Sequence, residues 1–107
     1  MSDIRIWKML KALEDLADDP SQLANLVYDG VADWTFTTKD GWSFEVFFDC
    51  GDPDYLNWIR FPTGEVFDFW GGNTSWVSCL ATNLILGPVG PVLLALAKKH
   101  KDWDYGD

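Results

Sequence analysis

Apolar residues at the start of the chain recur at the spacing of an α-helix. Over residues 3–18 they fall at intervals of three and four, while Lys11 and Asp15 are placed as an i,i+4 ion pair on the polar side. The residue before Pro20 avoids the helical conformation, whereas proline itself suits the first turn of a helix. The sequence therefore predicts one helix over 3–18 and a second helix over 20–29.

The pattern then changes to the two-residue alternation of β-strands. Apolar and polar residues alternate in two runs that are separated by a glycine-containing turn signal, and a second such turn follows further along. We expect a loop over 49–54 between the second strand and the third. The expected strands are 34–37, 42–49, 55–61 and 65–70.

The last third of the chain is helical in pattern. A helix is expected over 75–86, and Pro91 opens a final helix that ends at about residue 101. The order ααββββαα with short connections predicts an α+β fold: a four-stranded antiparallel meander with two N-terminal and two C-terminal helices. We expect a single domain over 1–107, with 102–107 as a frayed tail in which Trp103 docks.

Aromatic residues occupy both sides of the expected sheet. On the third strand, simple alternation places Tyr55 and Ile59 on one side and Leu56 and Trp58 on the other. A sheet with one face in water is not expected to be apolar on both faces. Either helices cover both faces, or one face exposes an aromatic patch among carboxylates, which is the usual mark of an interaction site.

The charge of the chain is strongly acidic and unevenly distributed. Its 107 residues include 17 acidic and 8 basic ones, which gives a formal charge of −9, and 16% of the residues are aromatic. Residues 12–97 alone hold 13 acidic and two basic residues, a charge of −11. Such a field repels phosphate, so we expect no direct nucleic-acid partner and no membrane partner. It favours a basic protein surface, because opposite charge speeds encounter.

The segment 49–55 is the sharpest local feature. Its carboxylates do not follow the calcium-loop spacing, so we expect no metal. They serve either as caps of a strand-to-strand turn or as an acidic recognition loop next to aromatic anchors. The predicted partner-binding residues are Asp49, Asp52, Asp54, Tyr55, Trp58, Glu65 and Asp68.

The stretch 41–64 contains a block of spaced residues. The block consists of Gly41-Trp42, Asp49-Cys50-Gly51, Asp54-Tyr55 and Pro62-x-Gly64. It resembles a family of small uncharacterised bacterial proteins, a domain of unknown function, with GW…DC…DY…P-D-G at similar spacing. The resemblance implies a shared hairpin core and brings no activity with it.

Catalytic signatures are missing from the sequence. With His100 as the one histidine, a histidine metal site or a Ser-His-Asp triad is not expected. Cys50 has no basic neighbour in sequence that would activate it, and no phosphate-binding glycine motif is present. We therefore expect no enzyme and no cofactor. Cys50 and Cys79 are either two reduced thiols or one disulfide.

Together these features favour a small acidic inhibitor of a larger, nucleic-acid-handling protein. In size and charge the chain is similar to anti-CRISPR-like inhibitors of phages and mobile elements, and to toxin immunity proteins. A carbohydrate-binding or small-ligand-binding module and an obligate structural subunit are the alternatives. Lys8 and Lys11 interrupt the first apolar residues, so we expect no signal peptide and a cytoplasmic monomer or homodimer.

Overall fold

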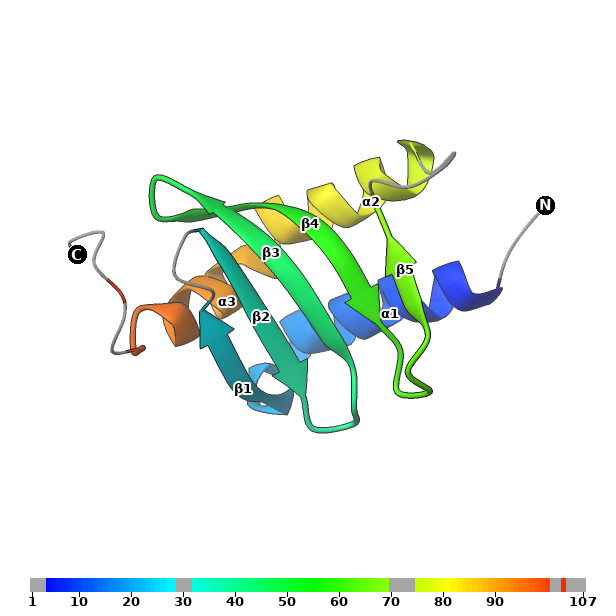
Figure 1. The fold of residues 1–107 in the computed structure, drawn as a ribbon, viewed down its shortest axis with the longest axis horizontal. Helices are drawn as coiled ribbons and strands as arrows, with labels where there is room; N and C mark the ends of the chain where they lie inside the picture. The colour runs from blue at the N-terminus through cyan, green and yellow to red at the C-terminus, as the bar shows by residue number, and fades with distance from the viewer. Residues whose placement is uncertain (1–3, 29–31, 70–74, 101–102, 104–107) are drawn as a thin grey trace.

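Five antiparallel strands and three α-helices make up the described part of the chain. The computed structural model describes residues 4–28, 32–69, 75–100 and 103. The strands pair in sequence order β1-β2-β3-β4-β5, so the sheet is a meander. All three helices lie behind it in Figure 1. The elements are α1 (Ile4–Asp18), the 3₁₀ turn η1 (Pro20–Gln22), β1 (Leu23–Tyr28), β2 (Asp33–Thr38), β3 (Ser43–Asp49), β4 (Asp52–Arg60), β5 (Val66–Asp68), α2 (Ser75–Leu86) and α3 (Gly90–Ala97).

The first helix forms as its periodicity predicts. Met9, Leu13 and Leu16 on its inner side are buried. On its outer side Lys11 Nζ lies 3.1 Å from Asp15 Oδ1, which confirms the expected i,i+4 pair. The fold class is therefore α+β as expected, although the number and order of the elements differ from ααββββαα.

The predicted second helix over 20–29 is wrong. One 3₁₀ turn is followed by β1, which pairs with β2. A β-bulge interrupts this pairing between Leu23 and Asn25. The extra residue shifts the alternation, so that Leu23, Leu26 and Tyr28 all lie opposite the inward residues of β2. Because of this inserted residue, Leu23 and Leu26 lie on the same side although they are three residues apart. This interval is typical of a helix, which explains the wrong prediction.

Two similar irregularities interrupt the pairing of β4 with β3. One lies between the β4 partners of Glu45 and Val46, and the other lies between the β4 partners of Phe47 and Phe48. They bury Leu56 and Ile59 on the same side and turn Trp58 to the other. The simple alternation that placed Leu56 with Trp58 is therefore wrong.

The expected loop over 49–54 is a two-residue hairpin turn. Cys50 has φ 53° and Gly51 has φ 86°, and Asp49 pairs directly with Asp52. Positive φ at both central residues is the geometry of a type I′ turn, which matches the twist of the flanking strands. Strand β4 consequently begins at Asp52, three residues earlier than the sequence predicts.

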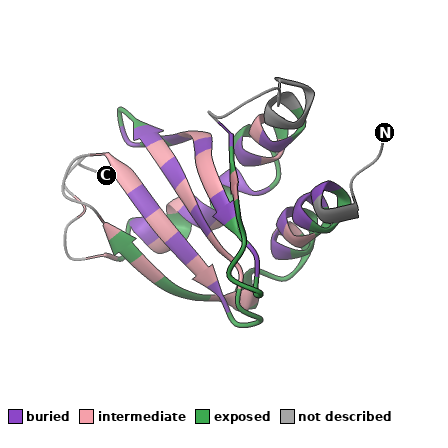
Figure 2. Ribbon diagram, turned by 45° about the vertical axis from the view of Figure 1, so that its right-hand side comes forward, coloured by how far each residue is buried: buried purple, intermediate pink, exposed green. Residues whose placement is uncertain are grey.

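The helices cover one face of the sheet and leave the other open. Along β2 and β3, buried residues alternate with half-buried ones, as the stripes in Figure 2 show. The buried set packs with α1, α2 and α3 into one core cluster. Of the two arrangements left open by the sequence, the structure therefore has the one in which a single face is covered.

The C-terminal helices meet at a close contact. The helix over 75–86 is confirmed, whereas the last one begins at Gly90 and ends at Ala97, before residue 101. A Cβ atom on Gly90 would lie 2.5 Å from the carbonyl oxygen of Ile85, so no side chain fits there without a backbone shift.

Within the described residues, no one helix combines the length and hydropathy needed to cross a membrane. The segments Leu80–Leu86 and Gly90–Ala97 have that length and hydropathy only when they are taken together, and the two are bent by 54° relative to each other. Trp103 docks as expected: its ring lies 6.0 Å from that of Trp34 and 6.3 Å from that of Phe48. The rest of the predicted tail over 102–107 lies outside the described residues.

Candidate functional site: the open sheet face

The face of the sheet turned away from the helices, called here the open sheet face, consists of the outward side chains of all five strands. Strand register arranges them in three cross-strand rows, each perpendicular to the strands. The first row is Asp33, Phe47 and Tyr55; the second is Val27, Thr35, Glu45, Trp58 and Asp68; the third is Asn25, Thr37, Ser43, Arg60 and Val66.

Aromatic rings form the middle of this face. Phe47 and Tyr55 are cross-strand neighbours whose ring centroids lie 4.9 Å apart at an interplanar angle of 20°. Trp58 lies in the next row, and the guanidinium carbon of Arg60 stands 5.3 Å from the centre of its ring. All three rings are half-buried without any helix above them. Such rings are rigid and amphipathic, which suits them to anchor a binding partner.

Two carboxylates, one in each of the first two rows, are held by one amide. Nδ2 of Asn57 donates a hydrogen bond to Asp33 Oδ1 at 3.0 Å and another to Glu45 Oε1 at 2.9 Å. Asn57 is the extra residue at one irregularity of β4, between the partners of Glu45 and Val46, and from there its side chain reaches across β3 to β2. The amide thus fixes the orientation of both acids on the open sheet face.

The seven residues predicted to bind a partner are only partly brought together. Tyr55, Trp58 and Asp68 share the open sheet face, and Trp58 pairs directly with Asp68. Asp49 and Asp52 face each other across the tight turn at one end of the β3–β4 hairpin.

The other two predicted residues lie apart from this group. Glu65 belongs to the turn between β4 and β5, at the opposite end of β4 from Asp52 (Figure 1). At about 3.3 Å per strand residue, the register of β4 against β3 puts it about 20–25 Å away along the strand. Asp54 is half-buried and is the extra residue at the other irregularity of β4. It lies between Pro53, which faces the core, and Tyr55, which faces outward. The predicted acidic loop is thus replaced by a sheet surface with acidic turns at its two ends.

Sequence reasoning missed four members of the open sheet face as site residues: Asp33, Glu45, Phe47 and Asn57. The alternation of β2 and β3 does contain a signal for the first three, because each has the parity opposite to that of the buried residues. No sequence signal identifies Asn57, since its position depends on a bulge.

The thiol of Cys50 is exposed, free and poorly suited to nucleophilic chemistry. Its hydrogen bond with Asp49 and the negative charge of that carboxylate raise its pKa, with a smaller contribution from Asp52. A raised pKa lowers the fraction of reactive thiolate. The side chain of Cys79, the other candidate for a disulfide, lies outside the described part of the chain.

Over the described ranges, no group of three or more histidine, cysteine, aspartate or glutamate side chains is placed to hold a metal ion. The open sheet face itself presents aromatic surface, carboxylates and hydrogen-bond acceptors.

No family model, curated protein or solved structure matches the chain. The resemblance over 41–64 and the similarity in size and charge to anti-CRISPR-like and immunity proteins consequently stay predictions.

Proposed function

We propose that this protein is a small acidic inhibitor that binds a basic surface of a larger, nucleic-acid-handling protein through its open sheet face. The observation that carries the proposal is the one-sided packing of the fold. Three helices cover one face of the sheet, and the uncovered face holds half-buried Phe47, Tyr55 and Trp58. Exposed aromatic surface of this kind is a common mark of a protein interface.

The charge around the rings supports a basic partner. Along the rows of the open sheet face, Asp33, Glu45 and Asp68 stand against one basic side chain, Arg60, among the described residues. The turn with Asp49 and Asp52 extends the negative surface beyond one end of the sheet. Lysine and arginine side chains of the partner that normally contact phosphate would meet carboxylates here. The inhibitor would then block the partner's nucleic-acid-binding surface, or imitate the nucleic acid itself.

Two biological roles fit this mechanism: an anti-defence inhibitor from a phage or mobile element, and an immunity protein that neutralises a nuclease toxin. A carbohydrate-binding role is less favoured, because the Arg60 guanidinium stands over the face of the Trp58 ring on which a sugar would stack, whereas a protein partner can contact the edge of that ring together with Phe47 and Tyr55. In all of these roles the chain acts by binding and not as an enzyme.

The test is binding of the full chain to purified basic nucleases, with affinity measured against salt concentration and nuclease activity measured in parallel. Inhibition with an affinity that falls steeply as salt rises is expected. Trp58→Ala should weaken binding by at least tenfold, because a central aromatic anchor typically contributes about 2 kcal/mol or more.

Charge-matched variants locate the interface. Asp68→Asn lies on the open sheet face and should slow association, whereas Asp18→Asn makes the same charge change at the end of α1, behind the sheet, and should leave it unchanged. Equal effects of both variants, or an affinity that does not respond to salt, would refute binding through this face.

A further inference from the structure

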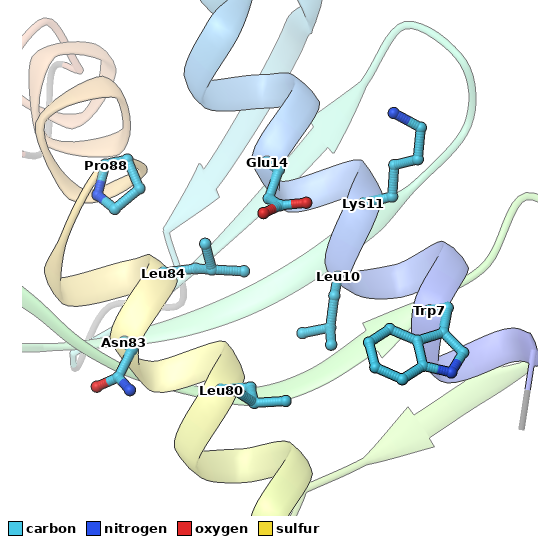
Figure 3. A pocket seen from close by; sticks show the side chains of 8 residues that line it. All are labelled: Trp7, Leu10, Lys11, Glu14, Leu80, Asn83, Leu84 and Pro88. Carbon is cyan, nitrogen blue, oxygen red and sulfur yellow. The ribbon is translucent and has the colours of Figure 1, made fainter. Parts of the chain in front are cut away.

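A groove of about 660 Å³ lies between α1 and α2, on the side of the molecule opposite the open sheet face. Its volume falls within the range of pockets that accept large apolar groups, about 300–1,000 Å³. Trp7 and Leu80 on its two walls are 54% and 41% exposed, so the groove is lined by large apolar side chains that together expose apolar surface, a feature of interaction sites. Figure 3 shows the lining residues: Trp7, Leu10, Lys11, Glu14, Leu80, Asn83, Leu84 and Pro88.

The α1 wall of the groove carries an ordered row of charge. Residues 7, 11, 14 and 18 follow one another at intervals of four, three and four, so they share one stripe of the helix. Lys11 precedes Glu14 and Asp18 along this stripe, which makes its first half basic and its second half acidic. All of these side chains are exposed.

A stripe with this order is complementary to itself when two copies run antiparallel. The midpoint of residues 11 and 14 coincides with the midpoint of residues 7 and 18, so reversing the stripe exchanges Lys11 with Glu14 and Trp7 with Asp18. About a twofold axis at that point, Lys11 of each copy faces Glu14 of the other copy. A twofold interface must match its own surface in this way, and each favourable contact then occurs twice.

The apolar part of the groove fits the same arrangement. Trp7 and Leu80 lie at one end of the groove, and Glu14 and Pro88 lie at the other (Figure 3). In an antiparallel pair, Trp7 of one copy comes to the end of the other copy's groove that holds Glu14 and Pro88, next to Leu84 in the middle of the groove. The same surface thus contains both a projecting indole and an apolar recess.

We propose that this groove is a homodimer interface, in which two copies of the chain pack α1 against α1 antiparallel about a twofold axis. A second copy is favoured over a foreign helix or a small apolar ligand because Lys11 and Glu14, at the centre of the stripe, exchange places when the stripe is reversed. The Lys11–Asp15 pair does not prevent this, since both side chains are exposed and the ammonium group has three donors. The dimer leaves both open sheet faces free and does not depend on the proposed function.

The experiment measures the mass of the full chain by sedimentation over a wide range of concentration. The wild-type chain should change from monomer to dimer as concentration rises. Lys11→Glu places two glutamates opposite each other, and Glu14→Lys places two lysines opposite each other. Each change replaces two attractions by two repulsions, so each variant should raise the dissociation constant about tenfold or more.

The decisive result comes from mixing the two variants. Neither pairs well with itself, but together they restore opposite charges at both contacts, so the mixture should form a heterodimer with nearly the wild-type affinity. The double variant Lys11→Glu/Glu14→Lys should dimerise again by itself. Trp7→Ala should weaken every one of these pairs by removing the apolar anchor.

Controls separate this interface from other effects. Lys39→Glu makes the same charge change in the β2–β3 turn, away from the groove, and should leave the dimer unchanged. Circular dichroism checks that each variant is folded. A wild-type chain that stays monomeric, single variants that dimerise as well as wild type, or a mixture that fails to associate would each overturn the proposal. Binding of a hydrophobic dye in the groove without any change of mass would identify a ligand site instead, and would also overturn it.

Discussion

The amide of Asn57 is predicted to be the residue that keeps the open sheet face in order. It donates to Asp33 at 3.0 Å and to Glu45 at 2.9 Å, both in partly buried surroundings. A hydrogen bond to a charged acceptor contributes roughly 1.5–3 kcal/mol where water is excluded. Water replaces part of this at a half-buried site, so Asn57→Ala should destabilise the fold by about 2 kcal/mol for the two bonds together.

Asn57→Asp sharpens the prediction, because it puts a third carboxylate where the amide now bridges two. At neutral pH it should be less stable than Asn57→Ala by about 1–2 kcal/mol of like-charge repulsion. Repulsion raises the folded-state pKa of the new carboxyl above its unfolded value. The folded state then binds the proton more tightly than the unfolded state. The extra loss of stability relative to Asn57→Ala is therefore present at high pH and disappears as pH falls through the folded-state pKa.

Urea denaturation followed by circular dichroism measures both variants. For Asn57→Ala, the urea concentration at the midpoint of unfolding should fall, while the dependence of the unfolding free energy on urea should stay unchanged. The melting temperature should drop by about 10 °C. At a protein concentration at which the chain is monomeric, Asn83→Ala removes an exposed asparagine from α2 and should be neutral or slightly stabilising. The reasoning is refuted if Asn57→Ala lies within about 0.5 kcal/mol of wild type, the range of ordinary surface changes. It is also refuted if Asn57→Asp matches Asn57→Ala at every pH.

Three further predictions concern the thiol, the helix junction and the first turn. Since Asp49 raises the pKa of the Cys50 thiol, alkylation of Cys50 near neutral pH should be slow, and Asp49→Asn should speed it; equal rates contradict this. Gly90→Ala should destabilise the fold by about 1–3 kcal/mol in denaturant titration, because its Cβ would lie 2.5 Å from the Ile85 oxygen. Hydrogen bonds lower the pKa of Asp19, so its contribution to stability is complete above about pH 4 and is lost as pH falls further. Asp19→Asn should therefore flatten the acid limb of the stability profile, and an NMR titration of the Asp19 carboxyl should give a midpoint below the ordinary value.

Strands with regular alternation were predictable from the sequence, and strands with bulges were not. In β2 and β3 the inward residues Trp34, Phe36, Phe44 and Val46 have the parity that the sequence indicates. In β1 one extra residue put Leu23 and Leu26 three apart on the same side, so a strand had the spacing of a helix. Periodicity identifies a strand only while its pairing is regular, because each bulge reverses the parity of all residues beyond it.

The candidate site was likewise predictable only in part. Its chemistry is in the sequence: acidic and aromatic residues are concentrated in the middle of the chain, and the sequence predicts that Tyr55, Trp58 and Asp68 bind a partner. Their grouping was not predictable, since it requires the register of β4 against β3 and β5. The structure spreads Asp49, Asp52 and Glu65 to the two ends of the sheet.

By itself the sequence determined the class of fold, the first helix and the excess of negative charge, because these depend on local spacing and composition. Tertiary structure decided which face of the sheet is covered. That choice depends on where the helices pack: all three bury their apolar sides on the same face, and the opposite face is left with aromatic rings that no helix covers. The residues on a bulged strand can be assigned to one face or the other only when the neighbouring strands are in place.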